Sequence, residues 1–345
     1  MIRVAINGYG RIGRVAHRII LQKHPELGVV AINAGSSTDL KGWMYLLKYD
    51  SNYGVLDGVQ LDVKPNTDTA KADLLGYLVV NGKDIPVYSQ KDATLLPWNA
   101  IGVDVVIEST GHLLTKEKAQ AHITSGARKV VMSAPAKDDT PPFVLSVNSK
   151  DYKGEPIVSN ESCTTNCITP VARIMEDVFG VEKAMMTTVH AYTSDQKLQD
   201  GGHKDYRRAR AAAHNIVPTT SGATHAAAQV IPSLQGIFNG MAIRVPVPTG
   251  SLSDFTFLLK KDTTVEEVND VFKKASQSET FKGILDVTTE PFVSSDIIGN
   301  SHSSIVDLSL TQVVGGNMVK VVAWYDNEWG YTSRLVELVQ EVGSK

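Results

Sequence analysis

A glycine-rich hexapeptide between an apolar strand and an amphipathic helix constrains the fold of this chain most. The hexapeptide, Gly8-Tyr-Gly-Arg-Ile-Gly13, follows the strand-like run Ile2–Ile6. It precedes apolar residues that recur at helical spacing from Ile12 to Ile20. In this context the glycines permit a tight turn, the close approach of backbone to a pyrophosphate, and close helix–strand packing. We therefore predict that the chain begins with a dinucleotide-binding βαβ unit.

Short apolar runs continue to alternate with helical patterns through the N-terminal half. A second helical stripe extends from Leu40 to Leu47, and Asn81-Gly82 between two apolar runs is typical of a hairpin turn. Because strands alternate with helices, we predict an α/β fold with a doubly wound, parallel Rossmann sheet. Its strands are predicted at Ile2–Ile6, Gly28–Ile32, Asp104–Glu108, Lys129–Met132 and Phe143–Val147.

The pattern changes after residue 163, where the strand-like runs become longer. Their connections favour a mostly antiparallel or mixed sheet in an α+β catalytic domain, with helices at Val265–Ala275 and from Glu328 to Val342. We expect a dinucleotide-binding domain at 1–162, completed by the C-terminal helix at 327–345, and a catalytic domain at 163–326. The longer strands are predicted at Met185–His190, Met241–Val245, Phe255–Leu259, Ile305–Leu310 and Met318–Trp324.

The decapeptide Glu161-Ser-Cys-Thr-Thr-Asn-Cys-Ile-Thr-Pro170 places Cys163 where a strand gives way to a helical pattern. A thiol at a helix N-terminus lies at the positive end of the macrodipole, which favours the thiolate. Neighbouring hydroxyl side chains add donors that suit a phosphate. The alternative is that Cys163 and Cys167 are small buried residues, the usual location of a free cysteine.

His190 ends the strand-like run in Thr187-Thr-Val-His-Ala-Tyr-Thr193 and is the best candidate for a general base acting on Cys163. The alternative is a hydrogen-bonded structural histidine, which is the commoner role of a single histidine. Sequence leaves both interpretations open.

Composition excludes several classes of function. The net charge of −3 and the hydrophobic content of 42% describe an ordinary globular protein, and nucleic-acid binding is not expected as its main role despite the basic run Lys204–Arg210. No Cys/His cluster has metal-ligand spacing, so no metal is expected, and no apolar run reaches the length of a membrane span. With two cysteines, and with a strand predicted from Ile2 that leaves no room for a leader, we expect a cytoplasmic protein; an organelle stroma is the alternative if a leader has been removed.

Taken together, these segments closely resemble phosphorylating glyceraldehyde-3-phosphate dehydrogenases, and the resemblance covers nearly the whole chain. It rests on the glycine-rich loop, the Cys163 decapeptide, the His190 segment, and blocks that occur in the family's order. Those blocks are Leu46-Leu-Lys-Tyr-Asp-Ser51, Glu108-Ser-Thr-Gly111, Ser133-Ala-Pro-Ala-Lys137, Arg207-Arg-Ala-Arg-Ala-Ala-Ala213 and Trp324-Tyr-Asp-Asn-Glu-Trp-Gly-Tyr331.

The resemblance implies oxidative phosphorylation of D-glyceraldehyde 3-phosphate to 1,3-bisphosphoglycerate, with reduction of NAD(P)⁺ through a thioester on Cys163. It makes His190 the base and implies a homotetramer in which segment 193–218 lies near a neighbouring subunit's cofactor. The substrate and inorganic phosphates are expected at Ser162, Thr164, Thr193, Asp195, Arg208, Ser221, Gly222 and Arg244. The cofactor is expected at Asn7, Gly8, Gly10, Arg11, Ile12, Gly13, Asn33, Ser36, Ser37, Lys91, Ser109, Thr110, Gly111, Asn327 (on the nicotinamide carboxamide) and Tyr331.

Several residues depart from the family's usual pattern. Ala34 stands where an aspartate commonly binds the adenosine ribose, and Gly201-Gly202 replaces a usual Leu-Pro. An acidic residue at position 34 would repel the 2′-phosphate of NADP, so its loss predicts use of both cofactors with NADP preferred. Glu161 replaces a common alanine and His225 a common lysine, and nothing in the sequence explains either.

Two other functions remain open at this stage. Erythrose-4-phosphate dehydrogenase shares the Cys/His chemistry but uses water as the final acceptor, and Thr193 with Asp195 fits the phosphorylating enzyme better. A non-catalytic binding protein on the same fold is the second alternative, because fold does not fix function. The presence of Cys163, His190 and Arg244 argues against it.

Overall fold

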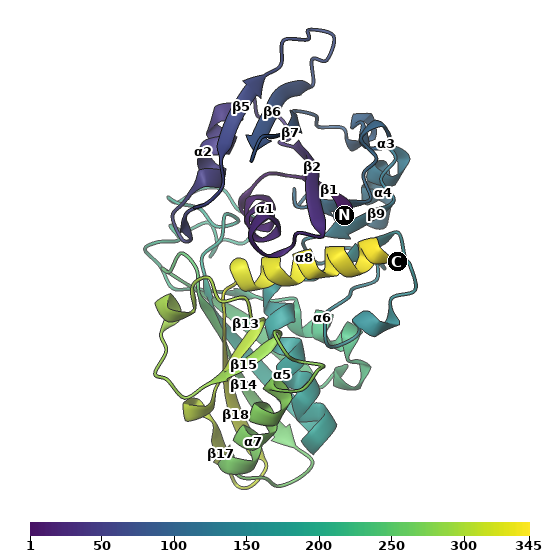
Figure 1. Cartoon of the computed structure of the whole chain (residues 1–345). Helices are drawn as coiled ribbons and strands as arrows, with labels where there is room; N and C mark the ends of the chain where they lie inside the picture. The colour runs from purple at the N-terminus through teal and green to yellow at the C-terminus, as the bar shows by residue number, and fades with distance from the viewer. The chain divides into compact units, whose positions relative to one another are not determined.

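The computed structural model describes residues 1–345, which divide into two compact units. Unit 1 comprises Met1–Phe143, Tyr152–Glu161 and Thr332–Lys345, and unit 2 comprises Val144–Asp151 and Ser162–Tyr331. Figure 1 labels many of the elements of both units and colours the chain from its N-terminus to its C-terminus.

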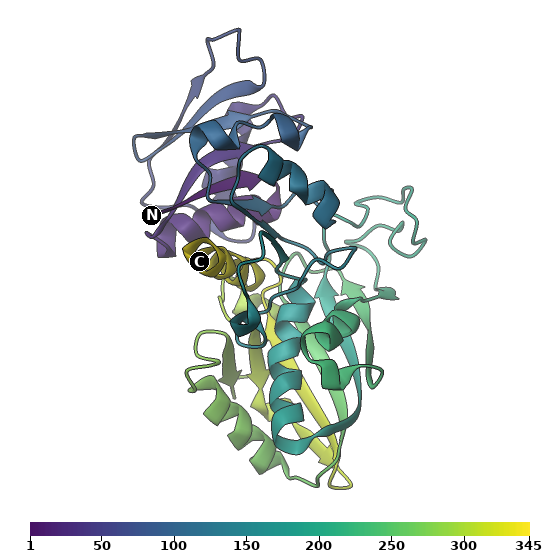
Figure 2. The same cartoon turned by 90° about the vertical axis from the view of Figure 1, so that its right-hand side faces the viewer.

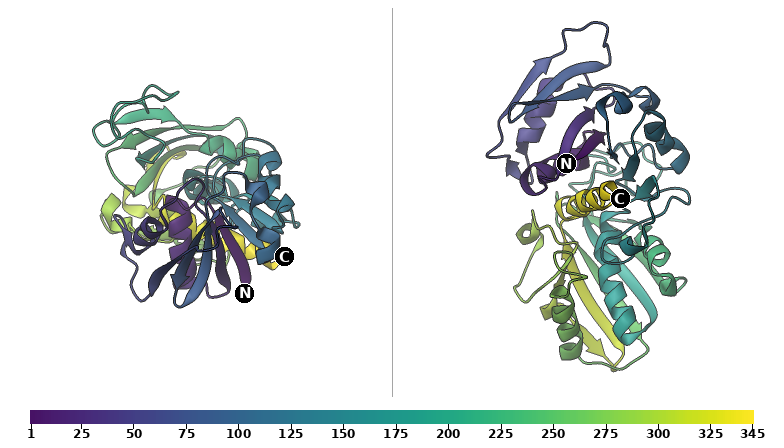
Figure 3. Two further views of the ribbon diagram at one scale, coloured as in Figure 1. Left: turned by 90° about the horizontal axis from the view of Figure 1, so that it is seen from above. Right: turned by 45° about the vertical axis from the view of Figure 1, so that its right-hand side comes forward.

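Unit 1 contains an eight-stranded sheet in the order β10-β9-β8-β1-β2-β7-β6-β5. The six strands from β10 to β7 are parallel to their neighbours, whereas β6 and β5 are antiparallel. The strands fan out with the twist of an open sheet (Figure 3, left). Their bounds are β1 Ile2–Asn7, β2 Leu27–Asn33, β5 Leu61–Pro65, β6 Leu74–Val80, β7 Lys83–Tyr88, β8 Val105–Glu108, β9 Lys129–Met132 and β10 Ile157–Ser159, with a separate pair β3 Tyr49–Asp50 and β4 Gly54–Val55.

Helices of unit 1 bury apolar stripes against this sheet. On α1 the stripe of Val15, Ala16 and Ile19 is fully buried, as the helical spacing predicts. Near the end of α8, Gly343 lies so close to the Ile2 side chain that a Cβ would stand 2.7 Å from it. The helices are α1 Arg11–Lys23, α2 Leu40–Lys48, α3 Trp98–Ile101, α4 Lys116–Thr124 and α8 Trp329–Ser344, which enters unit 1 at Thr332.

The predicted hairpin at Asn81-Gly82 is confirmed, since the dipeptide joins the antiparallel strands β6 and β7. Asn81 has φ 49° and Gly82 has φ 77°. Positive φ at both central residues is the requirement of a type I′ turn, whose twist matches that of the flanking strands.

The predicted strand Phe143–Val147 is wrong. This segment forms turns, and only the preceding Pro142 makes an isolated bridge, to Ser159. The Asn148 side chain accepts from the backbone N–H of Val144 at 2.8 Å, and Ser146 adopts φ 67°. A local side-chain bond of this kind competes with a sheet ladder, which a run of apolar residues does not reveal.

Unit 2 contains a mixed sheet in the order β12-β13-β11-β14-β18-β16-β15, with β17 paired to β18. The pairs β11–β13 and β15–β16 are parallel and the other pairs are antiparallel, as expected for this half. The predicted strand at 305–310 ends early, because a 3₁₀ turn begins at Leu308. The bounds are β11 Val181–Ala191, β12 Val217–Thr220, β13 Phe238–Val245, β14 Ser251–Leu259, β15 Leu285–Thr288, β16 Ser304–Asp307, β17 Gln312–Val314 and β18 Met318–Tyr325.

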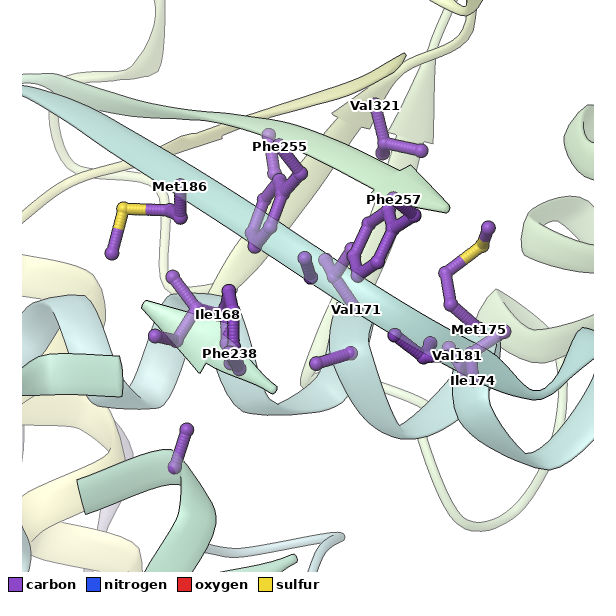
Figure 4. Packing of buried hydrophobic residues seen from close by; sticks show 14 of the residues in the cluster. Ile168, Val171, Ile174, Met175, Val181, Met186, Phe238, Phe255, Phe257 and Val321 are labelled. Carbon is purple, nitrogen blue, oxygen red and sulfur yellow. The ribbon is translucent and has the colours of Figure 1, made fainter. Parts of the chain in front are cut away.

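The core of unit 2 lies between helix α5 (Cys163–Phe179) and this sheet. Ile168, Val171 and Met175 of α5 pack toward Phe255 and Phe257 of β14, whose rings stack with centroids 5.5 Å apart (Figure 4). Figure 2 shows α5 running along the sheet beside α6 (Ala223–Val230). Helix α7 (Val265–Ser276) is capped by Thr264, whose side chain accepts from the backbone N–H of Glu267. No helix of the chain has the length and apolar character needed to cross a bilayer. This core fixes the N-terminal end of α5, where Cys163 lies.

The third glycine of the hexapeptide is required by packing. A Cβ at Gly13 would stand 2.3 Å from the backbone oxygen of Gly8 and 2.9 Å from the Ile6 side chain, whereas a Cβ at Gly10 would meet open space. We therefore expect Gly13→Ala to lower the free energy of unfolding of unit 1 by about 1–3 kcal/mol. Gly10→Ala is the control: its Cβ meets open space, so only the smaller loss of a good N-cap residue, about 0.5–1 kcal/mol, is expected. Thermal unfolding of both variants tests this, and equal stability of the two would contradict it.

Candidate active site

Cys163 is the first residue of α5, and Ser162 is its N-cap. The Ser162 hydroxyl oxygen accepts from the backbone N–H of Thr165 at 3.0 Å and lies 2.7 Å from the Thr165 hydroxyl. Cys163 is partly exposed, whereas Cys167, one turn further along, is fully buried. The alternative interpretation, in which both cysteines are small buried residues, is therefore correct for Cys167 but not for Cys163.

His190 lies near the end of β11 with its Nε2 atom 3.3 Å from Cys163 Sγ. Its Nδ1 atom lies 2.6 Å from the backbone oxygen of Ala191. The Ala191 oxygen can only accept from Nδ1, whereas the Arg244 guanidinium, 2.8 Å from the same atom, can only donate to it, so these two contacts do not by themselves fix the position of the ring proton. In the tautomer with the proton on Nδ1, Nε2 presents a lone pair to the thiol, which is the arrangement that a general base needs.

Arg244 lies beside this pair because β11 and β13 are parallel neighbours in which His190 stands opposite Arg244. Its Nη1 atom is 2.8 Å from His190 Nδ1 and 3.2 Å from the Ala191 oxygen. Burial lowers the pKa of His190 to about 3, and the Arg244 guanidinium acts in the same direction. The imidazole is therefore neutral at physiological pH.

The thiol differs from the sequence expectation of a favoured thiolate. Burial raises the pKa of Cys163, while Arg244 and hydrogen bonds from Thr164 oppose that rise without cancelling it. The position of Cys163 at a helix N-terminus therefore does not decide the charge of its sulfur. Burial disfavours the thiolate more strongly than the neighbouring Arg244 cation stabilises it. The pair is thus best described as a thiol facing a neutral base.

Tyr325, on β18, joins the site although no sequence pattern singled it out. Its hydroxyl lies 3.0 Å from Thr164 Oγ1 and 2.8 Å from Thr188 Oγ1, and its ring meets the His190 ring edge-on with centroids 5.9 Å apart. Thr188 donates onward to the Leu252 oxygen at 3.1 Å. The Thr164 side chain is therefore held by Tyr325, and a phosphate there would meet the helix backbone rather than a free hydroxyl.

A second polar cluster joins two of the predicted phosphate-site residues, Arg208 and Asp195. Arg208 donates to Asp195 at 2.6 Å, to Thr219 Oγ1 at 2.9 Å and to the Thr220 oxygen at 3.2 Å. Ser221 and Gly222 follow directly, with Gly222 as the exposed N-cap of α6. Arg208 and Asp195 both act on the pKa of Arg244, so the cluster lies within electrostatic range of the Cys163 pair. Thr193 is half-buried, and its backbone oxygen accepts from Gln196 at 2.9 Å.

Asn327 has one half of its amide fixed and the other half free. Its Oδ1 atom accepts from Ser251 Oγ at 2.8 Å and from the backbone N–H of Gly250 at 3.1 Å, whereas Nδ2 makes no hydrogen bond within the protein. An oriented amide N–H₂ of this kind suits a carboxamide oxygen. The neighbouring candidate Tyr331 is buried in the first turn of α8.

In unit 1 the glycine-rich loop has the form that a pyrophosphate requires. Gly8 has φ 94°, and a Cβ there would stand 2.6 Å from the backbone nitrogen of Thr110. Gly10 faces open space and caps α1 without a side-chain hydrogen bond, so the first N–H groups of the helix remain available to an anion. The Arg11 side chain pairs with Asp50 at 2.5 Å, and Ile12 is half-buried in the first turn.

The end of β2 lacks an acidic side chain. Asp39, the first acidic residue after the strand, caps α2 by accepting from Gly42 at 2.8 Å. Between them, Gly35 has φ 69°, Ser36 is exposed, and Ser37 Oγ accepts from the Trp43 indole at 2.9 Å. Asn33 is bonded in both directions to Gln90, at 2.8 and 3.0 Å, and the next residue, Lys91, is exposed. The cationic residue Lys91 therefore directly follows Gln90, which is hydrogen-bonded to Asn33 at the end of β2.

The other predicted cofactor residues surround the glycine loop. Ser109 donates from its hydroxyl to the Gly8 oxygen at 2.7 Å, Thr110 bonds to Glu108, and Gly111 is exposed with φ 74°. Asn7 is buried, and its amide bonds to Asn33 and Glu108. Asn7 and Asn33 thus support the loop from below, and their backbone oxygens accept from the N–H groups of Ser109 and Gly8 at 2.8 and 2.9 Å.

Two unusual residues differ in how far the structure explains them. Glu161 is 3% exposed and has φ 59°, and burial raises its pKa to about 7. A positive φ costs a non-glycine residue about 1–3 kcal/mol, and the alanine common at this position would bear a similar strain. His225 is exposed on α6, and nothing in the structure explains it.

Comparison with known proteins identifies the family. Residues 2–116 match the model for the glyceraldehyde 3-phosphate dehydrogenase NAD binding domain, and residues 162–327 match that for its C-terminal domain. The chain is 47% identical to glyceraldehyde-3-phosphate dehydrogenase of Streptomyces coelicolor and 48% identical to that of Geobacillus stearothermophilus, over 100% of the chain and 99% of each relative. It is also 48% identical to the chloroplastic glyceraldehyde-3-phosphate dehydrogenase GAPA1 of Arabidopsis thaliana, over 99% of the chain and 84% of that protein. The chain therefore belongs to the glyceraldehyde-3-phosphate dehydrogenase family.

Proposed function

We propose that this enzyme oxidises D-glyceraldehyde 3-phosphate to 1,3-bisphosphoglycerate, with inorganic phosphate as acceptor and a pyridine nucleotide as oxidant. The observation that carries the proposal is the 3.3 Å contact between Cys163 Sγ and Nε2 of His190. In this proposal unit 1 binds the dinucleotide and unit 2 carries the reacting thiol. Full-length identity of 47–48% to enzymes of that name supports it.

The first step joins the thiol to the aldehyde. Sγ of Cys163 attacks the carbonyl carbon, a C–S bond forms, and the thiol proton moves to His190 Nε2. The imidazolium then stabilises the oxyanion and returns the proton to it, which gives a hemithioacetal. Because the resting thiol keeps its proton, the base must act during the attack itself.

Oxidation and phosphorolysis follow on the same sulfur. Bound NAD(P)⁺ supplies the hydride acceptor. His190 takes the hydroxyl proton as the hydride leaves, so that a thioester remains on Cys163. Inorganic phosphate then forms a C–O bond to the acyl carbon while the C–S bond breaks, and the departing sulfur recovers its proton from His190.

The anion sites follow from the distribution of charge. Arg244 beside the Cys163 pair, with Thr193 and Asp195, is proposed to hold the phosphate of the substrate. Inorganic phosphate is proposed at Ser162, Thr164 and the N-terminus of α6 formed by Ser221 and Gly222, with Arg208 as a neighbouring cation. The ion pair of Arg208 with Asp195 fixes the direction of that guanidinium.

The cofactor residues fit a pyridine nucleotide on two counts. A side chain at Gly8 would collide with Thr110, and α1 offers an uncapped N-terminus to the pyrophosphate. Asn327 Nδ2 is a free, oriented donor for the carboxamide. Of the two nucleotides, we propose that NADP is preferred. Ala34 carries no charge that would repel the 2′-phosphate, and the Ser36 side chain is exposed to it. Lys91 follows Gln90, which is hydrogen-bonded to Asn33 at the end of β2, and so supplies a cation for the phosphate.

We also propose that four chains assemble, as the family resemblance implies. The segment 193–218 exposes three large apolar side chains, with exposed fractions of 81% at Leu198, 86% at Tyr206 and 70% at Ile216. Apolar surface of this kind is typical of a protein interface. A cytoplasmic location is part of the same proposal, since Cys163 and Cys167 are free thiols suited to a reducing compartment.

Replacing the reacting pair tests the mechanism. We expect Cys163→Ser to abolish aldehyde oxidation and His190→Asn to lower kcat by a factor of about 10²–10⁴, because the base is lost while the binding surface remains. Cofactor affinity, measured by fluorescence titration, should persist in both. Cys167→Ser is the matched control and should remain active, since that sulfur is buried away from His190. Near-normal turnover of Cys163→Ser would exclude the covalent mechanism.

Arg244 provides a test based on pH. Its positive charge opposes the rise in the pKa of Cys163, so removing that charge raises the pKa further. The thiolate, which exists above the pKa, is then formed only at higher pH. We expect Arg244→Gln to move the pH of half-maximal alkylation by iodoacetamide upward, while Arg173→Gln, further along α5, leaves it unchanged. An unchanged or lower midpoint for Arg244→Gln would contradict this electrostatic account.

Cofactor preference is tested by kcat/KM for NADP⁺ and NAD⁺ on one preparation. Wild-type enzyme should favour NADP⁺, and Ala34→Asp should shift the ratio toward NAD⁺ by about tenfold or more, because a carboxylate repels the 2′-phosphate and accepts from ribose hydroxyls. Ala34→Ser, which adds no charge, is the control and should shift the ratio much less. A wild-type enzyme that favours NAD⁺ tenfold would show that losing the acidic residue does not set the preference.

A further inference from the structure

A continuous chain of buried side chains lies beneath the glycine loop of unit 1. It runs from Gln90 through Asn33 and Asn7 to Glu108, and from Glu108 through His122 to Trp98. The last five of these residues are at most 3% exposed. Such a chain has a defined direction when an obligatory donor stands at either end.

The direction from the Gln90 end is fixed by a backbone N–H, which can only donate. Asn33 Oδ1 accepts it at 3.0 Å, so the Nδ2 atom of Asn33 is the one that donates to Asn7 Oδ1 at 2.7 Å. Asn7 must then present Nδ2 to Glu108 Oε2, which lies 2.6 Å away. Each amide orientation follows from the one before it.

The direction from the other end is fixed by the Trp98 indole, which also can only donate. Its Nε1 atom lies 3.0 Å from His122 Nδ1, so Nδ1 is the acceptor and the ring proton is on Nε2. His122 Nε2 then donates to Glu108 Oε2 at 3.0 Å. The two directed paths converge on one carboxyl oxygen.

Thr110 donates two hydrogen bonds to the other carboxyl oxygen of Glu108, Oε1. Its backbone N–H donates to Oε1 at 2.9 Å, and its hydroxyl donates to the same atom. Asn7, His122 and the Thr110 N–H are obligatory donors in these orientations, and the Thr110 hydroxyl donates as the fourth. Four donors of this kind suit a buried carboxylate, because a buried charge must be hydrogen-bonded.

Glu108 thereby fixes the turn on which the glycine loop rests. Thr110 nitrogen is the atom that a Cβ at Gly8 would approach to 2.6 Å, and Ser109 Oγ donates to the Gly8 oxygen at 2.7 Å. The Ser109–Gly111 turn and the Gly8 loop thus touch directly, and the carboxylate clamps Thr110 from below. Displacing Thr110 would displace the loop.

We propose that Glu108 is a positioning residue for the dinucleotide: its carboxylate, on which hydrogen bonds from Gln90 and Trp98 converge, holds the Ser109–Gly111 turn and the Gly8 loop in the shape that binds the cofactor. The inference rests on the proposed cofactor site and adds to it a residue that lies one layer beneath that site. Glu108 acts through Thr110, and through Asn7 and Asn33 it ties the loop to the end of β2.

The substitution Glu108→Gln preserves shape but breaks the direction of the chain. In one orientation its amide N–H₂ faces Asn7 Nδ2 and His122 Nε2–H, and in the other it faces the Thr110 N–H. Neither Asn7 nor His122 can reverse, because Gln90 and Trp98 set their orientations. Donors then oppose donors in a buried site, which weakens the clamp on Thr110.

A compensating variant is available in the same chain. Adding Asn7→Asp to Glu108→Gln moves the carboxylate by one residue, where it accepts from Asn33 and from the new glutamine amide. It also accepts from His122, whose Nε2 atom lies 3.2 Å from Asn7 Nδ2. The glutamine oxygen then remains for Thr110, and every donor again has an acceptor.

The test measures the dissociation constants of NADPH and NADH by fluorescence titration, together with kcat and the melting temperature. We expect Glu108→Gln to weaken nucleotide binding by about tenfold or more, with a much smaller loss in kcat at saturating cofactor. The double variant should recover affinity to within about threefold of wild type. Asn7→Asp alone, which places two carboxylates together, should bind as weakly as Glu108→Gln or worse.

Specific outcomes overturn the inference. Wild-type affinity in Glu108→Gln, or a double variant that binds no better than Glu108→Gln, would show that Glu108 does not position the loop. If Glu108→Gln does not fold, Thr110→Val removes one donor and keeps the shape; unchanged affinity there would have the same meaning. A wild-type enzyme that binds neither nucleotide would instead refute the proposed cofactor site, so the two failures are distinguishable.

Discussion

The 3.3 Å contact between Cys163 Sγ and His190 Nε2 is the interaction on which the chemistry of this chain depends. Two independent parts of unit 2 create it. The core between α5 and the mixed sheet fixes the start of the helix, while the parallel register of β11 and β13 sets His190 opposite Arg244. The Ala191 oxygen and Arg244 Nη1 both contact Nδ1, while Nε2 is the ring nitrogen that faces the thiol. A shift of one residue in that register would turn His190 away from the thiol.

The electrostatics of this pair reflect a balance in which burial outweighs attraction. Burial raises the pKa of Cys163 and lowers that of His190, so both groups are held in their neutral forms. Arg244 favours the thiolate but disfavours the imidazolium, and it therefore assists the nucleophile at the expense of the base. A substrate phosphate beside Arg244 would reduce both effects. The charge state of the pair should accordingly change when an anion binds.

Sequence predicted those parts of the structure that are encoded locally. The glycine hexapeptide, the stripes of α1 and α2, the Asn81-Gly82 turn and the helix beginning at Cys163 all follow from spacing and turn chemistry. The error at Phe143–Val147 arose because the Asn148 side chain takes the place of a strand partner. Tyr325 was missed because it reaches Thr164 and Thr188 only through the pairing of β18 with β14 and of β14 with β11. Contacts made across a sheet depend on register, which no local pattern contains.

The same physical rule governs both units: a buried polar side chain is oriented by a backbone or ring group that has only one hydrogen-bonding role. The Gly250 N–H fixes the amide of Asn327, and the Gln90 N–H and Trp98 indole fix the chain that ends on Glu108. An amide or imidazole in water would sample every orientation, so these obligatory donors and acceptors preorganise the groups before any ligand arrives. Preorganisation of this kind costs nothing at the moment of reaction, which is why it contributes strongly to catalysis and binding. It also makes the networks intolerant of isosteric change, because an exchange of oxygen for N–H₂ cannot be absorbed by rotation.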